Sequence, residues 1–195
     1  MPPSKQILDD NFHHEIVKKI PGGEKRGRPD IVHFALLDLI STPAYEEKLV
    51  RPVIHTINKD VILIADRVRL PRTELRFEGV MSKILRRDLG LDEKKFFGLH
   101  SAQSTGELIK FLKPRRIICL STQGVPKDLS RMVAESNSNV ENSTCLWIVG
   151  GFARGHFSEE TKSLADEIVS ISRYHLAAHV ITARLCYEIE QSLLR

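Results

Sequence analysis

The C-terminal quarter of the chain alternates most clearly between apolar runs and polar breaks. Residues 144–149 and 168–172 form two short apolar runs, and such runs predict strands that are buried on both faces. Residues 177–194 then carry apolar side chains at helical spacing, which predicts a closing helix. Both predicted strands end in polar or glycine-bearing loops, which is where open α/β sheets bind their ligands.

The rest of the chain continues this alternation of helices and strands. Residues 116–120 predict another buried strand, followed by a polar turn at 121–124. Residues 53–57 and 61–65 predict an antiparallel pair, in which the Asn or the Asp of the turn at 58–60 takes the special dihedrals. The remaining predictions are a strand at 96–100, helices at 12–20, 29–40, 72–89, 106–112 and 127–135, and a polar loop at 136–143. The predicted fold class is therefore α/β.

The composition fits one ordinary cytosolic domain. The chain has 195 residues, of which 42% are hydrophobic, enough for a sizeable core. Cys119, Cys145 and Cys186 are odd in number and form no CxxC motif, so we interpret them as reduced core residues. No apolar run reaches transmembrane length and no signal peptide is recognisable, so we expect a cytoplasmic protein without a membrane segment. The net charge of +4 is compatible with a nucleic-acid partner but decides little.

The positive charge is concentrated between Arg67 and Arg87, where seven basic residues accompany two acidic ones. Arg72 and Arg76 are four residues apart, so the predicted helix places them on one face, with Arg69 just upstream. One interpretation is a patch that binds the phosphates of a nucleic acid. The alternative is a solvated helix face, which is what most charge runs form.

The remaining candidates for chemistry are short motifs. Arg28 and Asp30 form either a functional ion pair or a capping acid beside a surface arginine, and the local sequence favours neither. His175 and His179 have a spacing that can hold zinc, but without a third ligand or HExxH we interpret them as core or capping residues and predict no metal site. GxGxxG and P-loop motifs are absent, which argues against a classical nucleotide site.

Four segments together carry a resemblance to a known family. They are GRPDIVHFALLDLISTP at 27–43, RLPRTELRF at 69–77, IVGGFARG at 148–155 and SISRYHL at 170–176. In this order they resemble ribosome-biogenesis methyltransferases of the SPOUT superfamily, which methylate N1 of a pseudouridine in small-subunit ribosomal RNA. The resemblance covers about residues 11–190 and is greater to archaeal than to eukaryotic members of the family.

The resemblance implies a fold, a cofactor and partners. Residues 1–195 would form a single SPOUT methyltransferase domain, with helices on both faces of the sheet, a trefoil knot at about 115–195 and a basic RNA-binding elaboration at about 50–90. S-adenosylmethionine would bind in the knot loops, and the protein would act as a homodimer on small-subunit ribosomal RNA. The implied cofactor-binding residues are Leu120, Ser121, Gly150, Gly155, Ile171, Ser172, Arg173, Tyr174, His175 and Leu176.

The resemblance also gives the arginines roles. Arg28, Arg69, Arg72 and Arg76 would contact the RNA, and Asp30 would hold Arg28 in place as the second catalytic residue. N1 of pseudouridine is a weak nucleophile until it loses its proton, so a cation beside the neighbouring carbonyl would stabilise the developing anion. Our hypothesis is that Arg28 is this cation.

Three features depart from the family pattern. Glu74 makes the RNA face less basic, and Arg173 and His175 replace the more neutral residues often found in the third cofactor loop. The chain also begins after the point at which family members have an additional first strand, so the sheet is expected to lack an edge strand.

Two other functions stay open at this point. The chain could be a ribosome-assembly factor that binds RNA, with methyl transfer secondary or lost, and tight binding of S-adenosylmethionine would favour the enzyme instead. It could also be a SPOUT enzyme for a different RNA such as transfer RNA. The arginine motif at 69–76 argues against that reading, through the resemblance.

Overall fold

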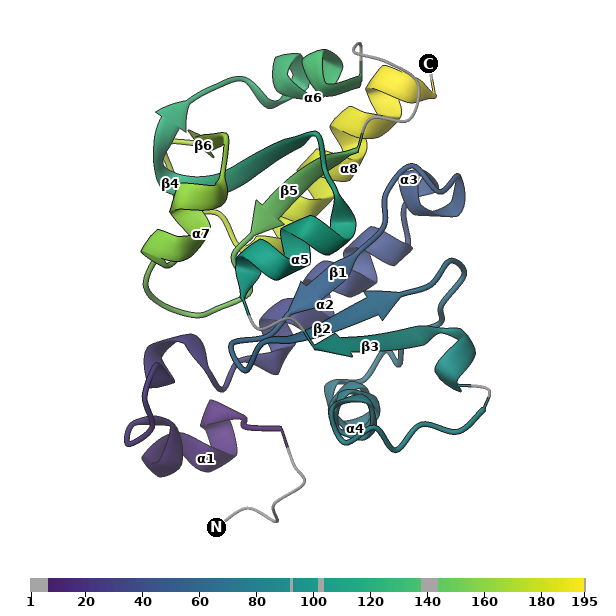
Figure 1. Ribbon diagram of the computed structural model, residues 1–195, viewed down its shortest axis with the longest axis vertical. Coiled ribbons are helices and arrows are strands. Elements are labelled where there is room, and N and C mark those ends of the chain that lie inside the picture. The colour runs from purple at the N-terminus through teal and green to yellow at the C-terminus, as the bar shows by residue number, and fades with distance from the viewer. Residues whose placement is uncertain (1–6, 92, 102–103, 138–143, 195) are drawn as a thin grey trace.

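The computed structural model describes residues 7–91, 93–101, 104–137 and 144–194, which form a mixed α/β fold around two three-stranded sheets (Figure 1). The strands are β1 (Val53–His55), β2 (Asp60–Ile64), β3 (Phe97–Ser101), β4 (Arg116–Pro126), β5 (Cys145–Val149) and β6 (Glu167–Ser170). The α-helices are α1 (Asp10–Val17), α2 (Pro29–Ile40), α3 (Pro43–Glu46), α4 (Glu74–Leu85), α5 (Thr105–Leu112), α6 (Leu129–Asn137), α7 (Glu159–Leu164) and α8 (Ala178–Leu193). Two 3-10 helices are η1 (Gly23–Lys25) and η2 (Glu93–Lys95). The predicted α/β class is confirmed.

The C-terminal half contains a parallel sheet in the order β5-β4-β6. The chain leaves β4 through α6, returns as β5 on one side, and passes through α7 to β6 on the other side. Figure 1 shows α5 and α7 in front of this sheet and α8 behind it. The predicted strands at 144–149 and 168–172 and the closing helix at 177–194 are confirmed to within one or two residues at each end.

The polar turn predicted at residues 121–124 is wrong, because β4 continues through it to Pro126. Leu120 and Val125 both align with Val169 of β6, so the four residues between them bulge out of the ladder and the strand then resumes. Gly124 allows this, since a Cβ added there would lie 2.4 Å from the backbone nitrogen of Val169. The three polar residues and Gly124 leave the ladder without ending the strand.

The N-terminal half contains an antiparallel sheet in the order β1-β2-β3. The predicted hairpin is present, and its turn is closed by a hydrogen bond from Lys59 N to Thr56 O of 2.9 Å. The residue with the positive φ is Lys59, at 70°, so the prediction that an Asn or Asp would take this conformation is wrong. The turn geometry selects the position, whatever side chain occupies it.

Helix α4 is shorter than the helix predicted at residues 72–89. Thr73 is its N-cap, with extended dihedrals, so α4 begins at Glu74 and Arg72 lies before it. At the other end Arg87 adopts φ 60°, which stops the helix after Leu85. The prediction that Arg72 shares a helix face with Arg76 is therefore wrong, although the two remain close along the chain.

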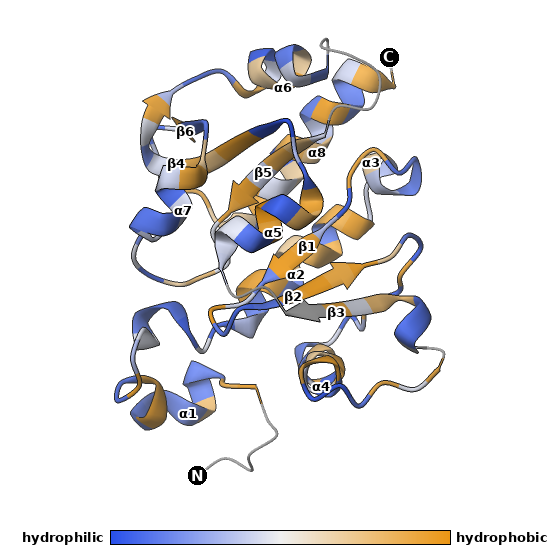
Figure 2. Cartoon of the chain, in the orientation of Figure 1, coloured by the Kyte–Doolittle hydropathy of each residue, from blue (hydrophilic) through white to orange (hydrophobic). Residues whose placement is uncertain are grey.

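Helix α2 joins the two halves, because it contacts both α4 and α8. Leu36 belongs to the core cluster that also contains Ile62 of β2 and Phe77 of α4. Leu39 packs against the cluster around Leu185 of α8. Figure 2 shows apolar residues concentrated on the strands and polar residues on the outer faces of the helices. The N-terminal end of α2 is consequently held in position from both sides.

Burial of the cysteines agrees in part with the sequence prediction. Cys119 and Cys186 are buried and Cys145 is half-buried, and all three are free thiols. Burial raises the pKa of Cys119 to about 12 and that of Cys186 to about 11, so both stay protonated at neutral pH. In the part of the chain that the structure describes, no helix is both long enough and apolar enough to cross a membrane.

Candidate active site

The candidate site lies at the edge of the parallel sheet where Leu120, Val149 and Val169 stand side by side. Leu120 of β4 is the register partner of Val149 in β5 and of Val169 in β6. Ser121, the first residue of the bulge in β4, and Gly150, the first residue after β5, therefore lie at one edge of the sheet, beside the loop that follows β6. Ligands of parallel sheets bind at the carboxyl ends of the strands. The structure thus brings the three predicted groups of cofactor residues to one edge.

The loop after β5 packs against the N-terminal quarter of the chain. A Cβ added to Gly151 would lie 3.1 Å from Cγ2 of Val32 on α2. A Cβ added to Gly155 would lie 3.4 Å from Cε of Lys25, and Gly155 has φ 87°, which favours glycine. Residues before and after Arg28 in the chain therefore both contact this loop.

An aromatic pair strengthens the same contact. Phe152 and Phe157 meet edge to face with their centroids 5.6 Å apart, and Nζ of Lys25 lies 5.4 Å from the centre of the Phe152 ring. Cations are attracted to the faces of aromatic rings at this distance. The sequence analysis missed this contact of Lys25, since nothing local indicates a partner so far along the chain.

The loop after β6 is held together by its own hydrogen bonds. Oγ of Ser170 donates to the carbonyl of Ser172 at 2.8 Å, and the backbone N–H of Tyr174 donates to Oγ of Ser172 at 3.0 Å. Arg173 lies over the ring of Tyr174 at 4.8 Å, and both side chains, like that of His175, are exposed. Half-buried apolar side chains flank them at Ile171 and Leu176.

Two surface pockets lie at opposite ends of the parallel sheet. A pocket of about 580 Å³ lies between the start of α6 and the middle of α8, with Ile171, Lys127 and Tyr187 among its lining residues. A second pocket of about 330 Å³ lies at the other ends of the strands, beside Arg116 and Cys145. Ile171 is the one predicted cofactor residue that lines either pocket. Of the predicted residues at this edge of the sheet, Ile171 is thus the one that connects to the larger of these two pockets.

Arg28 and Asp30 form an ion pair at the start of α2. Arg28 is the N-cap residue and Pro29 occupies the first helical position, where its fixed φ suits a helix start. Nε of Arg28 donates to Oδ1 of Asp30 at 2.8 Å, and Nη2 donates to Oδ2 at 2.6 Å. This bidentate contact fixes the guanidinium plane and uses two of its five N–H groups, so three can serve a substrate.

The hydrogen bonds between Arg28 and Asp30 stabilise the charged form of each group. The hydrogen bond from Arg28 is the main cause that lowers the pKa of Asp30, and the backbone N–H groups at the helix start lower it further. The hydrogen bond to Asp30 is likewise the main cause that raises the pKa of Arg28, with smaller contributions from Asp10 and Glu74. Both groups are therefore charged at neutral pH.

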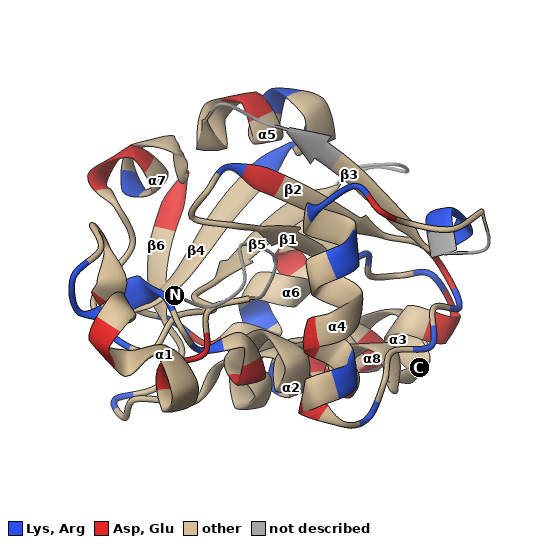
Figure 3. Ribbon diagram, turned by 90° about the horizontal axis from the view of Figure 1, so that it is seen from below, with Lys and Arg blue, Asp and Glu red and all other residues tan. Residues whose placement is uncertain are grey.

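The other predicted RNA-binding arginines lie along the approach to α4. Arg69, Arg72 and Arg76 are all exposed, the first two in irregular chain and the third in the first turn of the helix. Glu74 stands between the last two and is near enough to act on the charge of Arg28. The structure therefore places Arg28 at the start of α2 and Arg72 and Arg76 at the start of α4, with Arg69 in the chain that leads to α4. Figure 3 shows acidic residues interspersed with the basic ones on α4.

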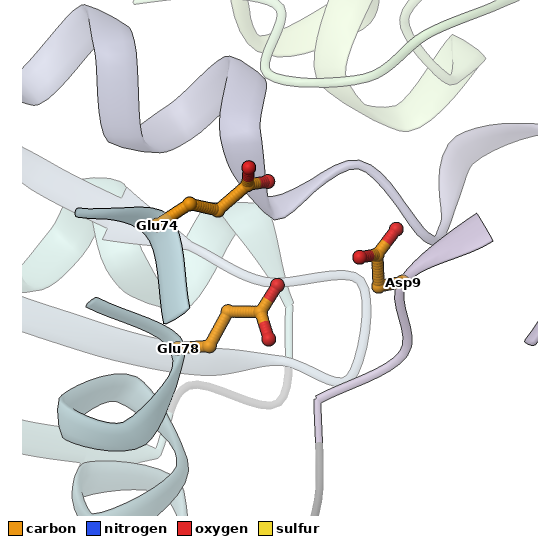
Figure 4. A group of neighbouring side chains, drawn as sticks. All are labelled: Asp9, Glu74 and Glu78. Carbon is orange, nitrogen blue, oxygen red and sulfur yellow. The ribbon is translucent and has the colours of Figure 1, made fainter. Parts of the chain in front are cut away.

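Three carboxylates meet beside this arginine group. Asp9, Glu74 and Glu78 each place a carboxylate oxygen within 4.8 Å of the others (Figure 4). Asp9 is buried and caps α1 by accepting a hydrogen bond from Asn11 N at 2.9 Å. Burial, followed by the charges of Asp9 and Glu74, raises the pKa of Glu78. The absence of a metal site remains a sequence prediction, because carboxylates gather in this way with or without an ion.

The cluster predicts that Glu78→Gln stabilises the protein at pH 7.5. Each removed like-charge contact, with Asp9 and with Glu74 at i–4, is worth a few tenths of a kcal/mol. Together they correspond to a rise in Tm of roughly 1–4 °C. A carboxyl with a raised pKa in the fold contributes stability that is present below its ordinary value of 4.5 and lost as the pH rises through the raised value. The gain should therefore shrink towards pH 4.5, as measured by thermal unfolding across pH.

The matched control is Glu15→Gln on α1, where the carboxylate lies 3.8 Å from Nζ of Lys18 and both side chains are mostly exposed. This variant should keep its Tm or lose slightly, because an exposed ion pair contributes little. A gain of similar size in both variants would contradict repulsion within the cluster.

The histidine pair considered for zinc does not form. His175 lies before the N-cap of α8 and is exposed, so it does not share a helix face with His179. The ring of His179 instead meets Phe34 of α2 edge to face at 6.3 Å. The sequence analysis also missed His33 and the carboxylate cluster, whose partners come from distant parts of the chain. A histidine within the apolar run of α2 is a signal that could have pointed to His33.

Comparisons with known proteins agree on one family. The family model for EMG1/NEP1 methyltransferases matches residues 1–190. The chain is 30% identical to the ribosomal RNA small subunit methyltransferase Nep1 of Methanothrix thermoacetophila, over 98% of this chain and 82% of the relative. It is 29% identical to the Pyrococcus furiosus protein of the same name, over 99% of this chain and 83% of that relative. Among solved structures, Archaeoglobus fulgidus Nep1 bound to S-adenosylhomocysteine matches with a TM-score of 0.81 and 26% identity, over 99% of this chain and 84% of that chain.

Proposed function

Because the chain belongs to the EMG1/NEP1 methyltransferase family, we propose that it transfers a methyl group from S-adenosylmethionine to N1 of a pseudouridine in small-subunit ribosomal RNA. The names of the relatives supply the ribosomal RNA, and the S-adenosylhomocysteine in the Archaeoglobus structure supplies the cofactor class. The observation that carries the proposal is the contact between the loop after β5 and both flanks of Arg28, at Lys25 and Val32. This contact supports a site in which Arg28 would meet the RNA beside the predicted cofactor loops.

The residues at the sheet edge fit the proposed cofactor. Gly150 and Gly155 keep Cβ atoms away from the loop, and a Cβ on Gly150 would lie 3.1 Å from the Phe152 ring. Leu120 is buried and Ile171 is half-buried, so this edge of the sheet also offers apolar side chains. We assign to cofactor binding the full set of Leu120, Ser121, Gly150, Gly155, Ile171, Ser172, Arg173, Tyr174, His175 and Leu176. When bound, S-adenosylmethionine supplies an electrophilic methyl group on a sulfonium.

The chain's own residues would then position the base and stabilise its charge. Methyl transfer needs the nucleophile in line with the sulfonium carbon, so geometry contributes most of the rate. N1 would lose its proton to solvent, and negative charge would spread to the neighbouring carbonyl until N1 bonds to the methyl carbon as the bond from that carbon to sulfur breaks. Arg28, fixed by Asp30, would donate to that oxygen. Arg69, Arg72 and Arg76 would hold the RNA phosphates.

The finer fold assignments are part of the same proposal. We infer one SPOUT domain over residues 1–195, with helices on both faces of its sheet, a trefoil knot at about 115–195 and an RNA-binding elaboration at about 50–90. The parallel order β5-β4-β6, with α8 passing behind it, supports the knot. The exposed arginines at 69–76 support the elaboration. A cytoplasmic location is proposed with the ribosomal RNA substrate.

We also propose a homodimer that packs through α6 and α8. Val125, near the end of β4, and Tyr187 of α8 are 63% and 53% exposed, although both are apolar. The pocket of about 580 Å³ lies between the start of α6 and α8. Exposed apolar side chains around a pocket are typical of an interface. Tyr187→Glu should therefore give a monomer by analytical ultracentrifugation. Leu91→Glu, at a residue 84% exposed elsewhere, should leave the dimer intact. If Tyr187→Glu is still a dimer, the interface does not lie at α6 and α8 and must be on another face of the protein.

The proposed activity is tested with labelled S-adenosylmethionine and two RNA stem-loops that differ only in pseudouridine or uridine at one position. Label on the pseudouridine RNA alone is the expected result and identifies the enzyme and its nucleophile together. Label on both RNAs would contradict N1 of pseudouridine as the acceptor. No label on either RNA, with salt-sensitive RNA binding retained, would indicate an RNA-binding assembly factor instead.

A further inference from the structure

His33 occupies a buried position between the two halves of the proposed RNA-binding group. It lies on α2, three residues after Asp30, and is 1% exposed. Its ring stacks on Phe77 of α4, with centroids 4.3 Å apart and an interplanar angle of 17°. A polar ring at such a position costs free energy unless it makes a specific hydrogen bond. Its partner should therefore show what the histidine is for.

The partner of His33 is the backbone carbonyl of Pro71, whose oxygen lies 2.7 Å from Nε2. A carbonyl only accepts, so Nε2 carries the hydrogen. Among the described residues Nδ1 has no partner, and a hydrogen there as well would leave a buried donor unsatisfied. The geometry thus selects the Nε2–H tautomer. The histidine therefore acts as a fixed donor to one carbonyl.

The carbonyl of Pro71 that accepts this hydrogen bond belongs to the segment that carries two of the predicted RNA-binding arginines. Pro71 lies in irregular chain between Arg69 and Arg72, just before the N-cap of α4. No helix or strand fixes the backbone of these two arginines. The other end of the link is α2, which starts with the Arg28–Asp30 pair. The hydrogen bond therefore connects the segment of Arg69 and Arg72 directly to the helix that presents Arg28.

We propose that His33 is a positioning residue that sets the spacing between Arg28 and the Arg69–Arg72 segment, so that both engage one RNA at the same time. The inference rests on the proposed function, since it assumes that these arginines contact the substrate. His33 itself touches neither RNA nor cofactor. Its effect should appear in RNA binding and in KM for RNA, while the cofactor loops at the edge of the parallel sheet are unaffected.

The test compares His33→Phe with His33→Gln in the full chain. Phenylalanine keeps a ring on Phe77 but removes the donor, while the amide nitrogen of glutamine can take the place of Nε2. We expect His33→Phe to weaken RNA affinity and raise KM for RNA by about tenfold, the effect of one buried hydrogen bond left unmade. The Kd for S-adenosylmethionine should stay within about twofold. His33→Gln should restore RNA affinity to within about threefold of wild type.

Two results would overturn the proposal. One is a loss of cofactor affinity that parallels the loss of RNA affinity, which is the signature of a general packing defect. The other is an RNA affinity of His33→Gln that is as low as that of His33→Phe, although the Tm of His33→Gln is higher than that of His33→Phe. RNA affinity is measured separately from turnover, so the two proposals can fail separately. If wild type binds the RNA without methylating it, the proposed activity falls while the affinity shift still decides the role of His33. If wild type binds no RNA, both fall.

Discussion

Arg28→Lys should reduce kcat about 100-fold while the Kd for S-adenosylmethionine stays unchanged, because loss of one donor to a developing oxyanion typically costs this much. The side-on contact with Asp30 fixes the guanidinium through Nε and Nη2. A lysine ammonium keeps the charge but is a point donor on a flexible stem, so it cannot both pair with Asp30 and hold a planar edge towards the base. The measurement is single-turnover methyl transfer to the pseudouridine stem-loop, with cofactor binding followed by calorimetry.

The matched control is the reverse exchange Lys110→Arg at an exposed position of α5, which should change neither quantity. Asp30→Asn is an informative companion, since it keeps the shape of the side chain but removes the charge that orients Arg28, and we expect an intermediate loss of kcat. Lost cofactor binding in Arg28→Lys would place Arg28 in the cofactor site and contradict its role at the base. An unchanged kcat would remove it from the chemistry altogether.

The pH dependence of the pair follows from the direction of its shifts. The pKa of Asp30 is lowered in the fold, chiefly by the hydrogen bond from Arg28. The stability that the pair contributes is therefore present above the ordinary carboxyl value of 3.8 and is lost only as the pH falls through the lowered one. Between pH 6 and 9 the pair keeps its charges. Any change of rate in that range has to come from the base or from another group.

Local signals predicted the elements that depend on neighbouring residues. The helix predicted at 29–40 is α2 with the same bounds, because Pro29 and Asp30 are start signals that act within one turn. The start of α4 was predicted too early, because Pro71 looked like a helix start while Thr73 supplies the N-cap. The two signals lie two residues apart, which is within the usual uncertainty of a helix boundary.

Contacts between distant residues account for what local signals missed. The continuation of β4 beyond Leu120 depends on pairing with β6, almost fifty residues away, which no window around residues 121–124 contains. The link from His33 to Pro71 and the approach of Asp9 to Glu78 also join separate segments. The family resemblance supplied the identities of the proposed site residues. It did not show how the loop after β5 meets Lys25.

Gly124→Ala should destabilise the protein more than any other single methyl group added to its sheet edge. The new Cβ would lie 2.4 Å from Val169 N and 2.5 Å from Ile168 C, distances that real Cβ atoms do not tolerate. Both contacts are backbone, so no side chain can turn aside, and β6 must move away from β4. We expect a loss of about 3 kcal/mol, which is typical of severe overpacking. That corresponds to a fall in Tm of roughly 6–12 °C.

The same shift should weaken the Kd for S-adenosylmethionine at least tenfold, since Ser121 lies in the bulge of β4 and Ile171 directly follows β6, the two strands that separate. Gly79→Ala is the matched control, because its added Cβ meets nothing within 4 Å and it lies inside α4. Alanine stabilises an exposed helix interior by about 1 kcal/mol relative to glycine. This variant should therefore rise in Tm by roughly 2–4 °C with unchanged cofactor affinity. A Gly124→Ala protein with wild-type Tm would contradict the close approach of β6 to the bulge in β4. If Gly124→Ala is destabilised but binds the cofactor normally, the close contact between β6 and the bulge in β4 does not contribute to the proposed cofactor site.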